Sequence, residues 1–380
     1  MVGISKVILF VVNSPEFFLS HRLPVALAAK EAGYEVHVAS AFGDSVKEIR
    51  KKGFFYHSIN FARSGQNPLV ELGTLVKLVR LLKKIKPDLV HLITIKPVLY
   101  GGIAARFAGV SGVISAVSGL GTVFLTDSVF AKFRRWLIAK LYSTAFKQKC
   151  LRVIFQNPDD RDTLISLGAL EVEKTRLIRG SGVSLADYRY VPEPEVSKPV
   201  VVMAARLLRD KGVVEFVEAA RILRDRGVKA QMRLIGSIDS GNLTSVSKYI
   251  LGEWEKEGVV EFMGFRSDIA EQYACAHIVC LPSYREGLPK SLVEAAACGR
   301  AVVTTNVPGC RDAITPNETG FLVPVRNPVA LAGAIQKLVE NPELRREMGE
   351  AGRVLAEKEF SIEKIVAQHL EIYDEVSGNA

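Results

Sequence analysis

The sequence lacks several patterns that would assign it to a membrane, secreted or metal-binding class. None of its apolar runs reaches the roughly 18 residues that a membrane-spanning helix needs. Its five cysteines form no C-x-x-C pair, and an odd number is typical of reduced cytosolic thiols. Zinc, EF-hand, P-loop and G-x-S-x-G patterns are also missing. The first residues lead directly into an apolar strand without a signal-peptide pattern, so we expect a cytoplasmic protein.

What the sequence does contain is an ordinary globular composition with an unevenly divided charge. Its 380 residues are enough for two or three domains, and 48% apolar with 24% charged residues is typical of soluble proteins. Residues 1–190 carry 27 lysines and arginines against 14 acidic residues, whereas the remainder carries 23 against 27. The basic first half predicts an anionic partner, either nucleic acid or an anionic membrane surface.

Two series of alternating strands and helices predict the fold class. Expected strands lie at 6–12, 35–40, 54–59, 88–94, 112–118, 152–156, 200–204, 233–235, 259–263, 278–281 and 301–305. Such alternation indicates parallel, doubly wound sheets, so we expect an α/β protein with two Rossmann-like domains facing across a cleft. The segment 185–199 contains three prolines and predicts a linker. The expected domains are therefore 1–190 and 191–360, with a helix in 361–380 packing back on the first.

One stretch, 283–295, combines an acidic loop with the start of a helix. Glu286 follows a buried strand that ends at Pro282, and Glu294 lies eight residues further on, inside the next helix. Ligands bind at the carboxyl ends of parallel strands, where helix N–H groups favour anions. Backbone groups here would bind a diphosphate and the carboxylates would accept hydrogen bonds from sugar hydroxyls. The candidate donor-binding backbone and side chains are Gly287, Leu288, Pro289, Lys290 and Ser291. The alternative is a solvated loop acid and a helix acid that favours the macrodipole.

Other loops of the second half add candidates at the same edge of the sheet. Arg206 and Lys211 stand after the strand 200–204, where a guanidinium and an ammonium could bind a diphosphate, although most such clusters are exposed basic turns. Gly236 would permit close approach of a ligand, and Phe265 with Arg266 could stack on a base. Ordinary turn chemistry is the alternative for these last three.

The first half offers weaker candidates at the carboxyl ends of its strands. Ser20 is a plausible N-cap, which would place His21 and Arg22 at a helix start. We predict that both bind an acceptor, together with Lys96, Gly119 and Gly121; the alternatives for His21 are a proton shuttle or an ordinary surface residue of the first turn. The Gly-x-Gly at 119–121 lacks the rest of a dinucleotide fingerprint, which argues against NAD. His91, in an apolar strand, is expected to be a hydrogen-bonded core residue.

The helix expected at 130–149 bears on the choice between anionic partners. Lys132, Trp136 and Lys140 share one face at 100° per residue, with Arg135 nearby and an aromatic and aliphatic stripe beside them. This pattern is typical of helices that lie on anionic membranes, although a core-packed amphipathic helix with solvated lysines remains open. No nucleic-acid motif accompanies the charge, so we predict a membrane surface and no nucleic acid.

Taken together, these motifs resemble the retaining glycosyltransferases of family 4, whose fold is called GT-B. The resemblance covers nearly the whole chain and is most specific at PSYREGLPKSLVEAAACGRAVVTTNVPGCRDAI, supported by ARLLRDKG at 205–212 and NETGFLV at 317–323. It implies that Glu286 holds the donor sugar, that Glu294 holds the ribose, and that Arg206 and Lys211 neutralise the leaving diphosphate. No metal or other cofactor is implied. The loop NSPEFFLSH departs from the glycine-rich loop of many members, and a first-domain histidine is missing, for which His21 is a weak substitute.

ARSGQNP at 62–68 and SGLGTVF at 118–124 resemble a narrower group within this family. Its members transfer an N-acetylhexosamine, often GalNAc in α-1,3 linkage, from a UDP-sugar to a sugar on polyprenyl diphosphate. They build bacterial O-antigen or glycoprotein oligosaccharides at the cytoplasmic face of the membrane, where the protein would be peripheral. Alternatives are a different nucleotide sugar, a soluble acceptor, a GT-B sugar-nucleotide epimerase or hydrolase, and a catalytically silent scaffold or nucleic-acid-binding module.

Overall fold

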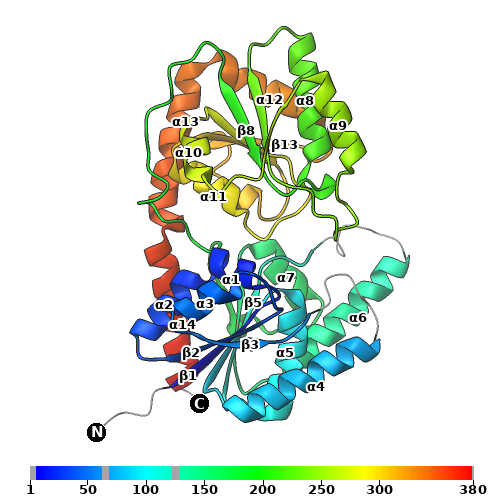
Figure 1. Ribbon diagram of the computed structural model, residues 1–380, viewed down its shortest axis with the longest axis vertical. Coiled ribbons are helices and arrows are strands. Elements are labelled where there is room, and N and C mark those ends of the chain that lie inside the picture. The colour runs from blue at the N-terminus through cyan, green and yellow to red at the C-terminus, as the bar shows by residue number, and fades with distance from the viewer. Residues whose placement is uncertain (1–5, 62–67, 122–128, 379–380) are drawn as a thin grey trace. The chain divides into compact units, whose positions relative to one another are not determined.

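The computed structural model describes residues 6–61, 68–121 and 129–378, which form two compact units (Figure 1). Unit 1 comprises residues 1–181 and 363–380, and unit 2 comprises residues 182–362. The chain therefore divides after Ser181, nine residues before the point that the prolines suggested. Among the described residues, no helix combines the length and apolar character that crossing a membrane requires.

Unit 1 contains a seven-stranded parallel sheet in the order β3-β2-β1-β4-β5-β6-β7. Its strands are β1 (Val7–Val11), β2 (Glu35–Ser40), β3 (Phe55–Ser58), β4 (Leu89–Ile93), β5 (Gly112–Val117), β6 (Cys150–Phe155) and β7 (Thr175–Leu177). The six strands expected in this half are all present. Strand β7 was not expected, because three residues are too few to show an apolar alternation.

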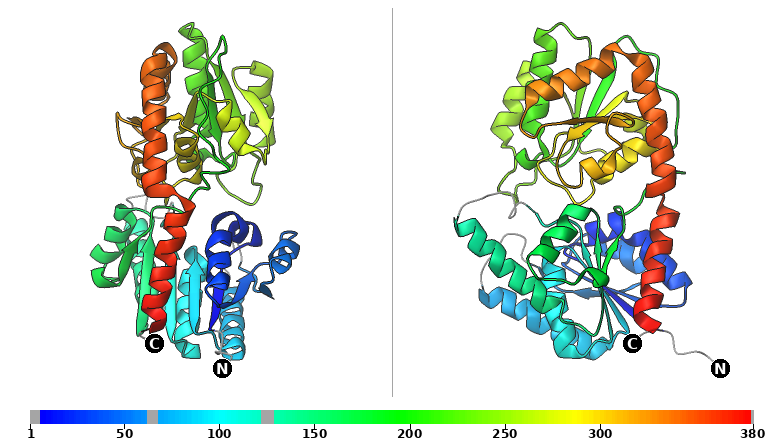
Figure 2. Two further views of the ribbon diagram at one scale, coloured as in Figure 1. Left: turned by 90° about the vertical axis from the view of Figure 1, so that its left-hand side faces the viewer. Right: turned by 180° about the vertical axis from the view of Figure 1, so that it is seen from behind.

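Helices cover both faces of this sheet (Figures 1 and 2). They are α1 (Pro15–His21), α2 (Leu23–Glu31), α3 (Val46–Lys51), α4 (Pro68–Ile85), α5 (Ile95–Ala108), α6 (Val129–Ala145), α7 (Pro158–Ser166) and α14 (Ile362–Gly378). Alternate residues of β1 serve two cores: Leu9 packs with α4, α5 and α6, whereas Phe10 packs with α1, α2 and α14. Side chains alternate in this way because successive residues of a strand point to opposite faces.

The corner after β1 differs from the sequence prediction. Ser14, not Ser20, caps a helix: its side chain accepts a hydrogen bond from Phe17 N, and Pro15 occupies the first turn of α1. Proline is favoured there because it has no N–H to satisfy and its φ is already helical. Ser20 lies inside α1, so His21 ends one helix and Arg22 joins it to α2, instead of both opening a single helix.

The last described helix, α14, completes the core of unit 1. Its Tyr373 hydroxyl lies 2.7 Å from Nδ1 of His91, and both side chains are fully buried. Its Glu375 accepts hydrogen bonds from Arg152 and Arg176. The prediction that His91 is a hydrogen-bonded core residue is therefore confirmed.

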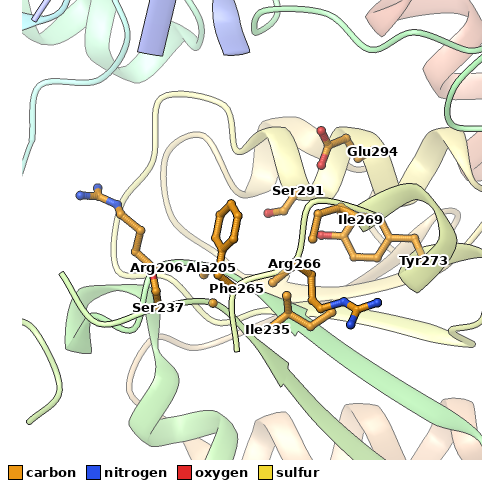
Figure 3. A pocket seen from close by; sticks show the side chains of 12 residues that line it. Ala205, Arg206, Ile235, Ser237, Phe265, Arg266, Ile269, Tyr273, Ser291 and Glu294 are labelled. Carbon is orange, nitrogen blue, oxygen red and sulfur yellow. The ribbon is translucent and has the colours of Figure 1, made fainter. Parts of the chain in front are cut away.

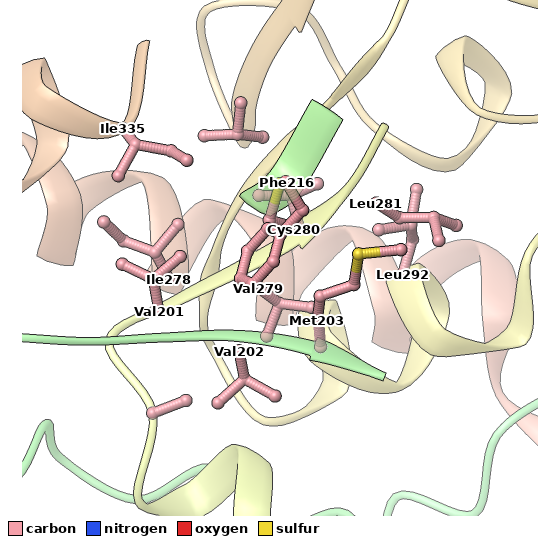
Figure 4. Packing of buried hydrophobic residues seen from close by; sticks show 14 of the residues in the cluster. Val201, Val202, Met203, Phe216, Ile278, Val279, Cys280, Leu281, Leu292 and Ile335 are labelled. Atoms are coloured by element: carbon pink, nitrogen blue, oxygen red, sulfur yellow. The ribbon is translucent and has the colours of Figure 1, made fainter. Parts of the chain in front are cut away.

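Unit 2 repeats the architecture with a six-stranded parallel sheet in the order β10-β9-β8-β11-β12-β13. Its strands are β8 (Val200–Ala204), β9 (Gln231–Ile235), β10 (Glu261–Gly264), β11 (Ile278–Leu281), β12 (Ala301–Thr305) and β13 (Gly320–Val323). Its helices are α8 (Val213–Asp225), α9 (Lys248–Glu257), α10 (Ile269–Ala274), α11 (Lys290–Ala297), α12 (Pro328–Glu340) and α13 (Pro342–Leu355). Figure 4 shows β8 and β11 at the centre, with Val202, Met203 and Val279 packed against the surrounding helices.

The proline-rich segment 185–199 is not the free linker that its composition predicted. Arg345 donates two hydrogen bonds to Glu193 at 2.8 and 2.9 Å, and both side chains are nearly buried. Arg300 donates to Val191 O and His277 contacts Pro194 O, at 2.9 and 3.0 Å. Prolines prevent a helix, but they do not prevent a segment from packing on a domain. Here buried arginines bind carbonyl and carboxylate groups of the segment.

Candidate active site

The candidate site of unit 2 lies where the strand order of its sheet reverses. Strands β8 and β11 are neighbours in the sheet, but the strands that follow them in the sequence are added on opposite sides. The loops after β8 and β11 therefore lie next to each other at this point. The two loops are joined: Asp210 O accepts hydrogen bonds from Ser283 Oγ at 3.0 Å and Tyr284 N at 2.9 Å. Gly212 has a φ of 77°, and a Cβ there would lie 2.1 Å from Pro282 O, so only glycine permits this approach.

This junction brings Lys211 and Glu286 together. Lys211 Nζ lies 2.5 Å from Oε1 of Glu286, and Ser283 Oγ lies 2.7 Å from the same oxygen. The exposed fractions of the two charged side chains are 22% and 12%. A carboxylate and an ammonium are thus held side by side, largely away from solvent, at the carboxyl end of the sheet.

A third loop, after β12, contacts the backbone of Glu286. Glu286 N donates to Pro308 O at 3.1 Å, and a Cβ on Gly309 would lie 2.5 Å from Glu286 O. Gly309 has a φ of 80°, and its N–H donates to Asp312 at 2.8 Å. The sequence motif that contains these residues assigned them no role, although Pro-Gly in the loop after a buried strand was an available signal.

Helix α11 places Glu294 beside these loops. Pro289 precedes the helix, and no capping side chain binds the backbone N–H groups of the first turn. Glu294 is 7% exposed, and burial raises the pKa of its carboxyl group, whereas Lys290, 3.2 Å away, lowers it. Tyr188 donates a hydrogen bond of 2.8 Å to Glu294 Oε1, a contact that no sequence pattern indicated.

A pocket of about 240 Å³ opens next to α11 (Figure 3). It is lined by Ala204, Ala205, Arg206, Ile235, Gly236, Ser237, Phe265, Arg266, Ile269, Tyr273, Ser291 and Glu294. A Cβ on Gly236 would lie 1.9 Å from Ala205 O, so this glycine lets two lining loops touch. Phe265 lines the pocket (Figure 3) and is 77% exposed, so its ring is accessible for stacking on a planar group.

The two arginines of this pocket extend to opposite sides of it in Figure 3. Arg206 Nη1 lies 2.8 Å from Asp239, and its side chain is 58% exposed. Arg266 is paired with Asp268, and this guanidinium holds the pKa of the carboxyl group well below its usual range. Both predicted residues therefore line the pocket, but their guanidinium groups contact carboxylates of exposed loops.

The predicted acceptor residues of unit 1 are not gathered into a comparable cluster. His21 stacks on Phe17, with ring centroids 4.1 Å apart, and its Nδ1 lies 2.7 Å from Ser20 Oγ. Arg22 is only 1% exposed, and burial lowers its pKa to about 10. Lys96 Nζ lies 2.5 Å from Glu71, which no sequence motif singled out. Acceptor binding by these residues stays a prediction.

A described residue at the carboxyl edge of the unit 1 sheet has a strained backbone. Thr94, directly after β4, has a φ of 74° and a ψ of 166°, a backbone conformation that residues other than glycine rarely adopt. Gly119 and Gly121 follow β5 with φ values of 116° and 71°. Part of SGLGTVF and most of ARSGQNP lie outside the described residues, so the structure adds nothing on those motifs.

Helix α6 presents apolar side chains to solvent. Trp136 is 53% exposed, Leu137 46% and Leu141 37%, and Lys140 lies 5.9 Å from the centre of the Trp136 ring. The opposite side of the helix, with Ala139, Tyr142 and Ala145, is buried. Arg135 is partly buried, and Lys132 lies in the part of α6 whose side chains the structure does not describe.

Comparison with known proteins decides the family. A model described as "Glycosyl transferases group 1" matches residues 187–355, and one described as "Glycosyl transferase 4-like" matches residues 7–157. The chain is 31% identical, over 95% of its length and 99% of the relative's, to the N,N'-diacetylbacillosaminyl-diphospho-undecaprenol alpha-1,3-N-acetylgalactosaminyltransferase of Campylobacter jejuni. The chain belongs to the family 4 glycosyltransferases.

Two further matches place this glycosyltransferase among known sequences and folds. The UDP-Gal:alpha-D-GlcNAc-diphosphoundecaprenol alpha-1,3-galactosyltransferase of Escherichia coli is 24% identical over 71% of each chain. The solved sucrose-phosphate synthase of Thermosynechococcus elongatus superposes with a TM-score of 0.80, covering 99% of this chain and all of that one, at 21% identity. The predicted family, the Rossmann-like units of the GT-B class and the enzyme class are thereby confirmed.

Proposed function

We propose that this glycosyltransferase moves an N-acetylhexosamine, GalNAc in α-1,3 linkage, from a UDP-sugar to a sugar carried on polyprenyl diphosphate. The observation that carries this proposal is the Lys211–Glu286 pair at the switch point of unit 2. The names of the Campylobacter jejuni and Escherichia coli relatives, both of which act on diphospho-undecaprenol-linked sugars, support this choice of acceptor.

Lys211, Glu286 and their neighbours bind different parts of the donor in this scheme. Lys211 and the first turn of α11 neutralise the diphosphate as it leaves, and Arg206 joins them when its guanidinium turns from Asp239. Glu286, whose Oε1 is held by Lys211 and Ser283, accepts hydrogen bonds from the donor sugar through Oε2. Ammonium, guanidinium and helix N–H groups supply the positive charge, so the scheme uses no divalent metal.

The pocket beside α11 holds the nucleoside in this scheme. Phe265 stacks on the base, and Glu294 accepts hydrogen bonds from the ribose hydroxyls. The acceptor hydroxyl attacks from the face that the diphosphate leaves, so the anomeric configuration is retained, and the leaving phosphate accepts the proton. A pocket of about 240 Å³ is small for a whole nucleotide sugar, which leaves the sugar to the loops of Glu286 and Lys211.

The acceptor is a lipid, and unit 1 carries a surface suited to the membrane that contains it. Besides Trp136, Leu137 and Leu141 of α6, the start of α4 exposes Leu69 and Leu72, at 78% and 56%. Helix α5 contacts both α4 and α6, so these side chains belong to one layer. By sequence, unit 1 has a net charge of +10 and unit 2 of −1. Apolar side chains among cations favour an anionic leaflet, so we propose peripheral binding at the cytoplasmic face.

A donor screen tests the catalytic proposal. UDP-GalNAc and UDP-GlcNAc are compared with GDP- and ADP-sugars by thermal shift, with and without EDTA, followed by assays with a polyprenyl-diphosphate-linked acceptor. We expect a UDP-selective shift that EDTA does not change, and UDP release that requires the acceptor. Release of UDP without acceptor would favour an epimerase or hydrolase, and the absence of any shift would contradict the proposal.

Vesicle sedimentation tests the membrane proposal. Full-length protein should sediment with phosphatidylglycerol vesicles and less with phosphatidylcholine vesicles, and the Trp136→Ser, Leu137→Ser variant should lose most of this binding. Leu243→Ser is the matched control, because Leu243 is a fully exposed apolar residue of unit 2. Equal losses for both variants, or equal binding to both lipids, would overturn the proposal.

A further inference from the structure

The segment 185–199 of unit 2 brings a phenol, that of Tyr188, into contact with Glu294, which lines the donor pocket. Arg353 Nη1 donates to Tyr188 O at 3.0 Å and to Ala297 O at 2.8 Å. Because Ala297 ends α11, one guanidinium fastens the backbone of Tyr188 to the helix that carries Glu294. The Tyr188 hydroxyl then donates to Glu294 Oε1 at 2.8 Å.

The two oxygens of Glu294 have different surroundings. Oε1 contacts both the Tyr188 hydroxyl and Lys290 Nζ, at 2.8 and 3.2 Å. Among the described residues, none donates a hydrogen bond to Oε2. Glu294 also lines the pocket next to Ser291, and Figure 3 shows both side chains leaving α11 beside it. The carboxylate is therefore held through one oxygen, while the other remains available to a ligand.

We propose that Tyr188 is a positioning residue for the donor: its hydroxyl fixes Oε1 of Glu294 so that Oε2 accepts a hydroxyl of the donor ribose. The proposal rests on the assignment of Glu294 to the ribose in the proposed function. Tyr188 does not contact the reacting atoms. It acts through Glu294, whose carboxyl group without this bond would rotate about its side-chain torsions.

The same bond affects the charge on Glu294. Burial raises the pKa of this carboxyl group, and hydrogen bonds from Lys290 and Tyr188 lower it. Tyr273 and Cys298 also face it, and burial keeps both in their neutral forms. Removing the Tyr188 hydroxyl therefore raises the pKa of Glu294 further. Glu294 must be ionised to accept hydrogen bonds from two hydroxyl groups. As the pH is lowered, the variant should therefore lose donor affinity at a higher pH than the wild-type enzyme does.

The test compares Tyr188→Phe with the wild-type enzyme by calorimetric titration with UDP, 2′-deoxy-UDP and 3′-deoxy-UDP. We expect Tyr188→Phe to weaken UDP binding about tenfold, because the hydrogen bond between the ribose and the charged Glu294 carboxylate is then no longer positioned. One of the two deoxy-nucleotides lacks the ribose hydroxyl that Glu294 binds. Tyr188→Phe should weaken the binding of that nucleotide less than about twofold, because it cannot form the hydrogen bond that Tyr188 helps to position. The acid limb of UDP affinity should also move to higher pH in the variant.

Tyr190→Phe is the matched control. It removes a phenol from the same segment, but this hydroxyl contacts Glu350 at 3.3 Å and lies away from Glu294. It should leave UDP affinity and its pH profile unchanged. Equal weakening of UDP and both deoxy-nucleotides by Tyr188→Phe would indicate a merely structural role, and an unmoved acid limb would likewise overturn the proposal.

A third variant separates this inference from the proposed function. If Glu294→Gln leaves UDP affinity unchanged, the ribose assignment fails and the inference fails with it. If Glu294→Gln weakens UDP but Tyr188→Phe does not, the assignment stands and only the positioning role is refuted. Circular dichroism and thermal melting of each variant establish that it is folded.

Discussion

The two units follow one topology but differ in how their charged residues are partnered. In both sheets the strand order reverses beside the first strand, between β1 and β4 in unit 1 and between β8 and β11 in unit 2. In unit 2 the two loops at this point are hydrogen-bonded together and hold Lys211 against Glu286. In unit 1 the cation after β1, Arg22, is buried, and Lys96 after β4 is paired with Glu71 of α4. Topology therefore fixes where a ligand can bind, whereas the partners of the side chains decide whether a site is already assembled.

The largest expected effect concerns this assembled pair. Glu286→Gln and Lys211→Met should each lower kcat by about 10² to 10³, because Lys211 neutralises the charge that develops on the leaving diphosphate and Glu286 holds both Lys211 and the donor sugar. Lys96→Met in unit 1 should act mainly on acceptor KM and by a smaller factor. Steady-state kinetics with varied donor and acceptor measure both.

Arg209→Met is the control for the kinetic variants, since Arg209 is an exposed cation two residues from Lys211. If Lys96→Met reduces kcat as much as Lys211→Met, the contrast between the units is wrong and both switch points contribute directly to the reaction.

The next largest effect is expected when glycines of similar φ in the two units are replaced by alanine. Gly212 of unit 2 and Gly168 of unit 1 have φ values of 77° and 66°, but only Gly212 has a neighbour where a Cβ would lie. Alanine should cost about 1–2 kcal/mol at Gly168, from backbone strain alone. At Gly212 it should cost about 3 kcal/mol or more, because Pro282 O must also move.

Urea unfolding of the two alanine variants measures this difference, and a separate kcat assay shows whether the displaced loop carries Glu286 with it. Equal losses of stability would mean that the junction of the β8 and β11 loops adapts to a Cβ without strain.

Acidification should affect unit 1 before unit 2. Burial lowers the pKa of His369 to about 3 and that of His91 well below its usual value, with the Arg22 charge adding to both effects. The unfolded chain binds these protons at about pH 6.5, so stability is complete above that pH and falls between pH 6.5 and 3. Each histidine lowers the free energy of unfolding by up to about 1.4 kcal/mol for each pH unit below 6.5, or by about 2 kcal/mol at pH 5.

Hydrogen exchange of β4 and α14, compared with β8 and β11 at pH 7 and 5, follows this loss. His369→Leu should reduce the pH dependence in unit 1 by about one proton. His277 of unit 2, whose pKa burial also lowers, predicts a smaller response there. Faster acid-induced exchange in β8 than in β4 would refute the assignment.

The smallest effect is expected at Arg22. Its guanidinium is buried without a described carboxylate partner and donates one hydrogen bond, to His21 O at 2.9 Å. Replacing a buried charge by an apolar side chain of similar length is often neutral or stabilising, so Arg22→Met should raise the unfolding free energy by about 1 kcal/mol. Chemical denaturation tests this. A loss of several kcal/mol would show that the charge is compensated inside the fold.

Where the sequence predicted the structure correctly, simple geometry was at work. Strand and helix alternation requires parallel sheets, and parallel strands bring their following loops to one edge, so the order of the strands alone was enough to place Lys211 and Glu286 at the same edge. The expected core role of His91 followed in the same way from its apolar strand. These inferences use only periodicity and the direction of strands.

Where prediction failed, the determining contacts were aperiodic or long-range. Helix α1 was missed because seven residues beginning at a proline show too little periodicity. The ion pairs of Arg206 with Asp239 and of Arg266 with Asp268 were also not predicted, because the sequence does not show which carboxylate an exposed arginine contacts. The ligand-binding roles of both arginines stay predictions. Tyr188 was hidden in a segment whose prolines suggested a linker, since composition does not reveal what binds a carbonyl group.

The place of α14 in unit 1 has a consequence for how the protein is made. This helix covers Phe10 and His91, but it follows the 181 residues of unit 2 in the chain. At roughly 5–20 residues per second, a ribosome needs about 10–35 seconds to synthesise that insertion. During this interval, the part of the first sheet that α14 covers stays exposed while the second unit can already fold. Nascent unit 1 should therefore be the part of the molecule that chaperones bind.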